Sequence, residues 1–137
     1  MSAAPDAFAE FLPPRVLDMA LVIPLASAIK LCEHWPGVPL HFPAEPGPDH
    51  PISLVIGWEQ AKLICQVYAG TNPVMPRLNR YYQARRDQFI IDALENKTMS
   101  GSELALQFGL RSDRVYEIYA QYRKAQQGDL FQQGDSQ

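Results

Sequence analysis

The feature that most constrains the fold is a repeat between Leu21 and Pro76. The segment LVIPLASAIKLCEHWPGVPLHFP (21–43) aligns without a gap on LVIGWEQAKLICQVYAGTNPVMP (54–76), so that each residue number of the second segment is that of the first plus 33. Seven of the 23 aligned positions are identical, and both segments end in proline. Such agreement indicates a tandem duplication of one structural unit. Two copies are too few for a solenoid, because that architecture needs at least three stacked repeats.

Each copy predicts a helix followed by a short extended segment. Apolar residues recur at helical spacing, and Gly37 or Gly70 follows at the expected C-terminal end of the helix. The extended pieces VPLHF and NPVM then lead to a proline. The predicted buried faces consist of Leu25, Ala28, Cys32 and Trp35 in the first copy and of Trp58, Ala61, Cys65 and Tyr68 in the second.

The duplication also predicts how the copies pack. A pseudo-two-fold axis pairs the two helices and pairs the extended segments as two short antiparallel strands, with residues 44–51 as the hinge. We therefore expect a mainly α fold in three parts. Residues 1–76 form a tandem helix–strand (pseudo-dimer) module, residues 77–124 form a three-helix helix-turn-helix unit, and residues 125–137 form a flexible tail. Assembly of the duplicated unit with a second chain, as a homodimer, stays open.

Charge is unevenly distributed along this chain of net charge −3. Residues 1–70 hold three basic and seven acidic side chains, whereas residues 77–124 hold nine basic and six acidic ones. A basic segment of this kind favours an anionic partner. Four arginines occur within ten residues without an intervening acid: Arg77, Arg80, Arg85 and Arg86.

The C-terminal half has the residue pattern of a helix-turn-helix. A first helix is expected over 78–96, with an inner side formed by Phe89, Ile90, Ala93 and Leu94. The twenty-residue motif then starts at Gly101, with the small Ala105 where two helices cross and Gly109 in the turn. Ser112 is expected to start the second helix as its N-cap. The core positions of the motif are Leu104, Phe108, Leu110, Val115 and Ile118.

The second helix is expected to present one face to a partner. Its inner face is Val115, Ile118, Tyr119 and Tyr122. On the outer face, the carboxylates of Asp113 and Glu117 can accept from cytosine N4 in the major groove, but they repel phosphates. Basic side chains around them must therefore supply affinity. The predicted DNA-binding residues are Arg111, Ser112, Asp113, Arg114, Tyr116, Glu117, Gln121, Arg123 and Lys124, with Arg77, Arg80, Arg85 and Arg86.

Residues 52–124 combine these parts in one order. Ile56-Gly57 is followed by a helix that ends at Gly70, then by Pro76-Arg77, and the pattern ELA…FGL…VY.I falls on 103–118. In this order they resemble the Mor (middle operon regulator) and C transcription activators of Mu-like phages. The resemblance implies a sequence-specific regulator of phage or prophage type that binds double-stranded promoter DNA and assists RNA polymerase. It also implies a dimer of helix–strand units, to which this chain adds the extra copy 21–43.

The tail carries a second candidate binding motif. Its residues Gln127, Asp129, Leu130 and Phe131 resemble the peptide by which bacterial proteins dock on the DNA sliding clamp. In such a peptide the Leu-Phe pair anchors in an apolar pocket. The alternative function is therefore a protein-binding adaptor that acts on the replication or transcription machinery, in which the helix-turn-helix need not touch DNA.

Other classes of function find no support in the sequence. Cys32 and Cys65 fall on apolar helix faces, and no cysteine or histidine pair has zinc-finger spacing, which predicts buried structural cysteines and no metal site. The chain has no nucleophile–base pair, glycine-rich phosphate loop or paired carboxylates, so we expect no catalytic residues, no enzyme activity and no cofactor. The sequence also lacks a signal-like N-terminus and any apolar run long enough to span a membrane, so a cytoplasmic protein is predicted.

Overall fold

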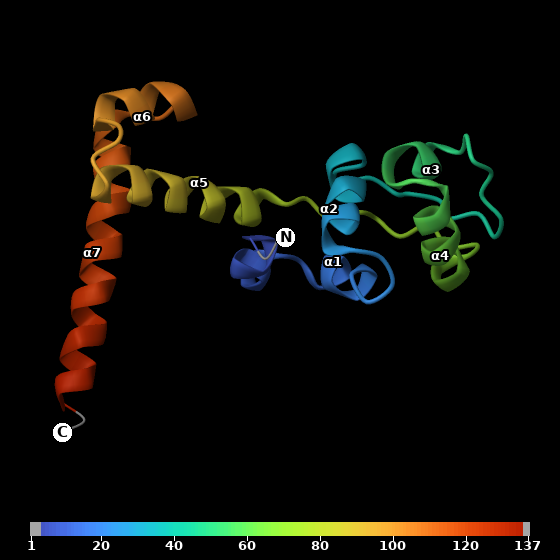
Figure 1. Cartoon of the computed structure of the whole chain (residues 1–137), viewed down its shortest axis with the longest axis horizontal. Coiled ribbons are helices and arrows are strands. Elements are labelled where there is room, and N and C mark those ends of the chain that lie inside the picture. The colour runs from blue at the N-terminus through green and yellow to red at the C-terminus, as the bar shows by residue number, and fades with distance from the viewer. Residues whose placement is uncertain (1–3, 136–137) are drawn as a thin grey trace. The chain divides into compact units, whose positions relative to one another are not determined.

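The computed structural model describes residues 4–135 of the chain, with the side chains of residues 8–128. The fold is mainly helical, as predicted (Figure 1). The chain divides into two compact units, residues 1–82 (unit 1) and residues 83–137 (unit 2). The boundary falls inside one helix, α5 (Asn79–Glu95). Each unit has a hydrophobic core of its own.

Unit 1 consists of short helices joined by turns and extended segments. The 3-10 helix η1 (Ala4–Phe11) precedes four α-helices: α1 (Pro14–Met19), α2 (Leu25–His34), α3 (Pro51–Ile56) and α4 (Trp58–Tyr68). In Figure 1, α1 packs against α2, α2 against α3, and α3 against α4. Leu78 and Tyr81, around the first turn of α5, complete the same core.

Prolines and a glycine determine where the helices of unit 1 begin and end. Pro14 and Pro51 occupy the first turns of α1 and α3, where a backbone N–H has no partner within the helix and its absence costs nothing. Gly57 separates α3 from α4, because its φ of +91° lies outside the helical range. Glycine suits this position, since that φ is strained for any residue with a side chain. As a result α4 begins at Trp58, the position equivalent in the repeat to Leu25 at the start of α2.

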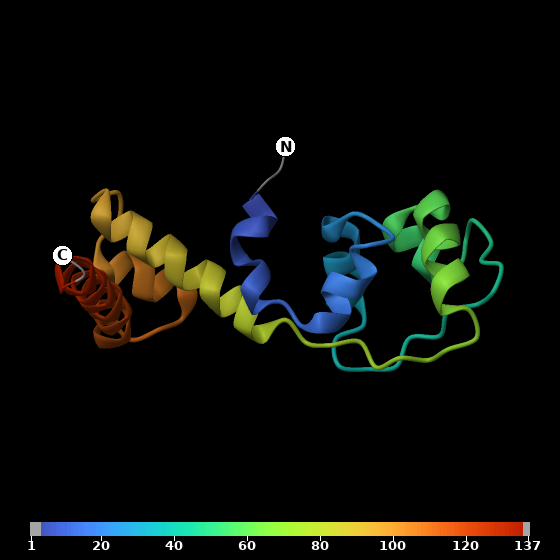
Figure 2. The same cartoon turned by 90° about the horizontal axis from the view of Figure 1, so that it is seen from below.

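The extended segments that follow α2 and α4 run beside each other (Figure 2) but form no β-strand within the described residues. The predicted two-stranded antiparallel pairing is therefore wrong. Backbone hydrogen bonds do join the segments, as from the N–H of Gly37 to the carbonyl of Met75 at 2.9 Å, but the bridge between Pro39 and Val74 is an isolated one. Proline explains the difference, because Pro39 and Pro73 have no N–H to donate to a continuous ladder.

The core of unit 1 follows the predicted helix faces with one exception. Ala28, Cys32, Ala61 and Cys65 are buried, and Leu25, Trp35 and Tyr68 are partly buried against them, as predicted. Trp58 was predicted to lie on the buried face, but 44% of it is exposed. The reason is its place as the first residue of α4, from which its indole Nε1 donates to the carbonyl of Pro46 at 2.9 Å.

Unit 2 contains the rest of α5 together with α6 (Gly101–Phe108) and α7 (Ser112–Asp135). α6 packs against α7, and both share a core with α5. Ile90 and Ala93 are buried and Leu94 is partly buried, as predicted, but Phe89 is 46% exposed and forms a T-shaped ring contact with Phe108. Among the described helices, none combines the length and apolar character that crossing a bilayer requires.

Candidate nucleic-acid interface

The turn between α6 and α7 is built by local signals at both ends of α6. The hydroxyl of Ser100 accepts from the N–H of Glu103 at 3.1 Å, and the carboxylate of Glu103 accepts from the N–H of Ser100 at 2.8 Å. This capping box satisfies two N–H groups that a helix start leaves without partners. At the other end Gly109 takes a left-handed conformation, with a φ of +66°, and ends the helix.

The inner faces of α6 and α7 form the core of unit 2. Leu104 and Val115 are fully buried, and Ala105 is buried where the two helices meet. The complete predicted set is confirmed, because the remaining members, Phe108, Leu110, Ile118, Tyr119 and Tyr122, belong to the same cluster. With one side of α7 committed to packing, the opposite side is the one that can meet a partner.

Tyr116 lies beside that core but not in it. About half of the residue is exposed, and its ring covers the start of α6 at Gly101. A methyl group on Gly101 would lie only 2.6 Å from Cε2 of Tyr116 and closer still to the end of the ring. Gly101 is thus required by contact with a side chain of the second helix, although its backbone conformation is ordinary for a helix.

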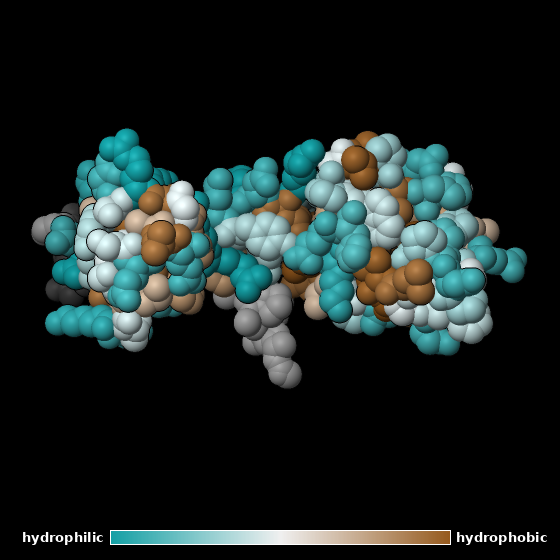
Figure 3. All heavy atoms as spheres, turned by 90° about the horizontal axis from the view of Figure 1, so that it is seen from above, coloured by the Kyte–Doolittle hydropathy of each residue, from teal (hydrophilic) through white to brown (hydrophobic). Residues whose placement is uncertain are grey.

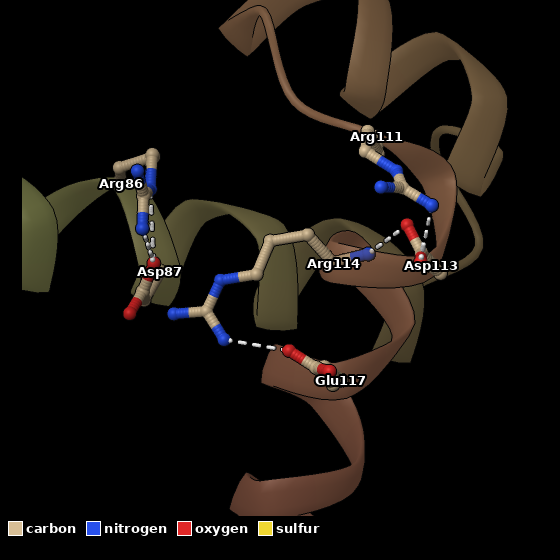
Figure 4. A network of polar contacts seen from close by, with 6 residues as sticks. All are labelled: Arg86, Asp87, Arg111, Asp113, Arg114 and Glu117. Atoms are coloured by element: carbon tan, nitrogen blue, oxygen red, sulfur yellow. Dashed lines mark hydrogen bonds and ion pairs between the residues drawn. The ribbon is translucent and has the colours of Figure 1, made fainter.

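The outer face of α7 begins with two ion pairs, which Figure 4 shows together. Nη2 of Arg111 lies 3.2 Å from Oδ2 of Asp113, and Nη1 of Arg114 lies 2.9 Å from Oε1 of Glu117. The second pair has the i, i+3 spacing that places two helical side chains side by side. Each of the two acids that the sequence places on this face is therefore balanced by a neighbouring arginine.

Asp113 has a further role at the start of α7. Its Oδ1 accepts from the backbone N–H of Arg114 at 3.0 Å, near the positive end of the helix dipole. The carbonyl of Arg111 accepts from the N–H of Val115, which puts Arg111 at the N-cap and Ser112 in the first turn. The prediction that Ser112 is the N-cap was wrong by one residue. Asp113 supplies the side-chain acceptor instead.

Both ion pairs are open to solvent. The side chains of Arg111 and Asp113 are 86% and 67% exposed, and those of Arg114 and Glu117 are 44% and 63% exposed. Exposed pairs of this kind contribute only about 0.2–1 kcal/mol each, so an incoming anion can replace the carboxylate at little cost. The ion pairs therefore orient the two arginines and leave them accessible to a partner.

Arg123, another predicted DNA contact, is engaged with α5. Its Nη1 donates to the hydroxyl of Tyr119 at 3.1 Å and lies 3.6 Å from Oε2 of Glu95, and the Tyr119 hydroxyl donates to the same carboxylate. The hydrogen bond to Tyr119 and the neighbouring charges raise the pKa of the Arg123 guanidinium. This cluster ties α7 to the end of α5, a role that the helix periodicity gave no reason to expect.

The four arginines of 77–86 are divided between the two units. Arg77 and Arg80 belong to unit 1, where the Arg77 guanidinium packs over Gly37. Arg85 and Arg86 belong to unit 2. Arg86 donates from both Nε and Nη2 to Oδ1 of the adjacent Asp87, at 3.0 and 2.8 Å (Figure 4).

The remaining predicted contacts are at the surface. Gln121 and Lys124 are exposed on α7. The proposed clamp-binding motif also lies along α7, whose backbone continues as a helix to Asp135. Gln127 is exposed, but the side chains of Asp129, Leu130 and Phe131 lie outside the described residues.

The two cysteines are buried free thiols, as predicted. Burial, with a smaller contribution from the charge of Glu33, raises the pKa of Cys32 to about 11, and burial raises the pKa of Cys65. Within the described part of the chain, no three His, Cys, Asp or Glu side chains come together as a possible metal site.

Comparison with known proteins gives a family match over the part of the chain that contains the helix-turn-helix. Neither a curated protein nor a solved structure matches the chain. The family model of the Mor transcription activator family matches residues 48–132. The match covers more than half of the chain and takes in the second copy of the repeat, α5, α6 and most of α7. On this basis the chain belongs to the Mor transcription activator family.

Proposed function

We propose that this protein is a sequence-specific double-stranded DNA-binding transcription activator of phage or prophage type, whose α7 enters the major groove. One observation carries the proposal: the inner side of α7 is packed on α5 and α6, while its outer side exposes charged side chains from Arg111 to Lys124. In helix-turn-helix proteins the second helix is placed in this way, and its N-terminal residues meet base edges.

In this proposal the arginines and the carboxylates of the two ion pairs have different roles in DNA binding. An arginine that exchanges its carboxylate for a phosphate positions the helix without reading sequence. The released carboxylates of Asp113 and Glu117 can then accept from cytosine N4, and Gln121 on the next turn can pair with adenine. Arg123 and Lys124 on α7, with Arg85 and Arg86 of the same unit, extend the phosphate contacts.

Activation requires a second contact besides DNA. We include RNA polymerase as the partner, because the family to which the chain belongs consists of transcription activators.

Replacing Arg114 with alanine tests the role of α7. We expect weaker binding to duplex DNA across sequences and a salt dependence whose slope falls by about one, because one phosphate contact is lost. Lys62→Ala is the matched control, since Lys62 is also paired with an acid three residues away but lies on α4 in unit 1. Equal effects of the two substitutions, or none from Arg114→Ala, would contradict the proposal.

A second candidate is the protein-binding adaptor acting on the replication or transcription machinery. One observation favours it: the arginines that begin α7 are each neutralised by an acid. Glu117→Gln separates the candidates. If the protein reads DNA, the variant should bind duplex DNA more tightly, because the carboxylate no longer repels phosphates. Its base preference should also change at one position, because the charged acceptor for cytosine N4 is lost. An adaptor should show no salt-sensitive binding to duplex DNA in either form.

A further inference from the structure

Several equivalent positions on the inner faces of α2 and α4 have the same environment. Ala28 and Ala61 are both fully buried, as are Leu31 and Ile64. Cys32 and Cys65 are buried to the same degree, and all of these side chains belong to a single core. The inner faces of α2 and α4 thus contribute equivalent residues to one shared interior.

The backbone hydrogen bonds between the extended segments follow the same relation. The N–H of Gly37 donates to the carbonyl of Met75 at 2.9 Å, and the N–H of Gly70 donates to that of Phe42 at 2.8 Å. Gly70 is the equivalent of Gly37, and Phe42 is the equivalent of Met75, so each bond is the counterpart of the other. In a two-fold arrangement, each contact from the first half to the second is matched by the equivalent contact in the opposite direction. These two hydrogen bonds are matched in this way.

A second pair of bonds repeats this exchange. The N–H of Phe42 donates to Thr71 at 3.1 Å, and the N–H of Met75 donates to Val38 at 2.8 Å. The bond from Leu40 to Pro73 has no counterpart, because proline has no N–H to return.

One side-chain contact joins a position to its own equivalent. The hydroxyl of Ser27 donates to the side-chain carbonyl of Gln60, which occupies the same place in the second copy. In a two-fold arrangement, a residue meets its own equivalent only near the axis. The axis therefore passes between α2 and α4.

From these relations we infer that the first copy occupies, within the same chain, the place that a partner subunit would fill, so that the protein is a monomer with a single helix-turn-helix. A symmetric dimer would supply one such motif from each subunit. Here the second unit 2 is missing, because the first copy leads into the hinge and not into another α5.

A consequence for the DNA target rests on the proposed function. Dimeric helix-turn-helix proteins bind two half-sites about 10 base pairs apart, and the symmetry of the site mirrors that of the protein. A single α7 reads one half-site, so the preferred sequence is short and is not an inverted repeat.

The outward faces of α2 and α4 differ, and the more apolar face, that of α4, is the one on which a homodimer could form. Leu63 and Val67 on α4 are 46% and 59% exposed, and the equivalent positions on α2 are Lys30 and His34. In the face of the molecule shown in Figure 3, hydrophobic residues reach the surface in separate groups among hydrophilic ones.

The mass of the full-length protein in solution tests the inference without DNA. Sedimentation from low to high micromolar concentration should give 15.4 kDa throughout. The unfolding temperature should also stay constant with protein concentration, because association of folded chains would stabilise them by mass action and raise it. A species of twice that mass, or a midpoint that rises with concentration, would overturn the inference, and Leu63→Lys would then show whether the α4 face is responsible.

Selection of duplexes from a random-sequence pool tests the consequence for DNA. We expect an enriched sequence without two-fold symmetry, bound by one chain per duplex. An enriched inverted repeat bound by two chains would overturn the single-arm assignment. A monomeric mass with no enriched sequence would overturn the proposed function and leave the monomer standing.

Discussion

At the scale of single residues, Cys32 shows how burial couples one side chain to pH. Its thiol is almost completely buried, and the pKa is raised from 9.0 to about 11. A thiol with a raised pKa in the folded state favours folding while it is neutral. That contribution is complete below the pKa of the unfolded chain and is lost as the pH rises toward the folded value.

Alkaline pH should therefore weaken unit 1. We expect the free energy of unfolding to fall between about pH 9 and about pH 11, by roughly 2–3 kcal/mol for a shift of this size. Urea titrations followed by the fluorescence of Trp35 and Trp58, both in unit 1, would measure the loss. Cys32→Ala should be less stable at neutral pH but should lose less on going to pH 11. Parallel pH profiles would show that other groups cause the decline.

At the scale of secondary-structure elements, the contact between the start of α6 and α7 depends on a missing side chain. Tyr116 covers Gly101 closely enough that a methyl group must displace the ring. In Gly101→Ala we expect a loss of about 1 kcal/mol, at the low end for an overpacked site because the end of an exposed tyrosine can move. With Tyr116→Ala already present, the same substitution should be neutral or slightly stabilising, since alanine favours helix over glycine.

A double-mutant cycle measured by circular dichroism gives this coupling directly. Tyr116→Ala alone serves as the control for the loss of the ring. If Gly101→Ala costs the same in both backgrounds, the ring does not press on Gly101 in solution.

The elements also show how far the sequence could predict the structure. Spacing alone was sufficient for the helix-turn-helix core, because Leu104, Val115 and Ile118 must all face inward in one arrangement. Composition could not show whether the extended segments would form two β-strands or only isolated hydrogen bonds. The result depended on which residues of the other segment lie opposite Pro39 and Pro73.

Around the candidate interface, contacts between residues close in sequence were predictable, and contacts between distant residues were not. The spacing of Arg114 and Glu117 was a usable signal for an ion pair, and Ser100 with Glu103 was one for a capping box. The link from Arg123 to Glu95 was not predictable, because it joins residues of α7 and α5 that are far apart in the sequence.

At the scale of the whole molecule, the two separate cores predict separate responses to substitution. Both tryptophans lie in unit 1, so their fluorescence reports on that unit, whereas circular dichroism reports on all helices. Ser100→Ala should cost about 1 kcal/mol in unit 2 by removing the capping box. The dichroism transition should shift while the tryptophan transition stays in place.

Ser102→Ala is the matched control for this substitution, because Ser102 is exposed in the same first turn of α6. It should change stability by less than about 0.5 kcal/mol. A tryptophan transition that moves with the dichroism transition in Ser100→Ala would show that the two units unfold together.

The segment 44–51, predicted as the hinge between the copies, bears on how the amount of active protein depends on expression. In the monomer that we infer, this hinge holds the two halves of unit 1 at a high effective concentration, so that their pairing does not require a second chain. The amount of binding-competent protein then rises in direct proportion to the number of chains made, whereas a dimer accumulates as the square of that number when chains are scarce. Even the first few copies would be competent to bind, and the response to expression would be graded without a threshold.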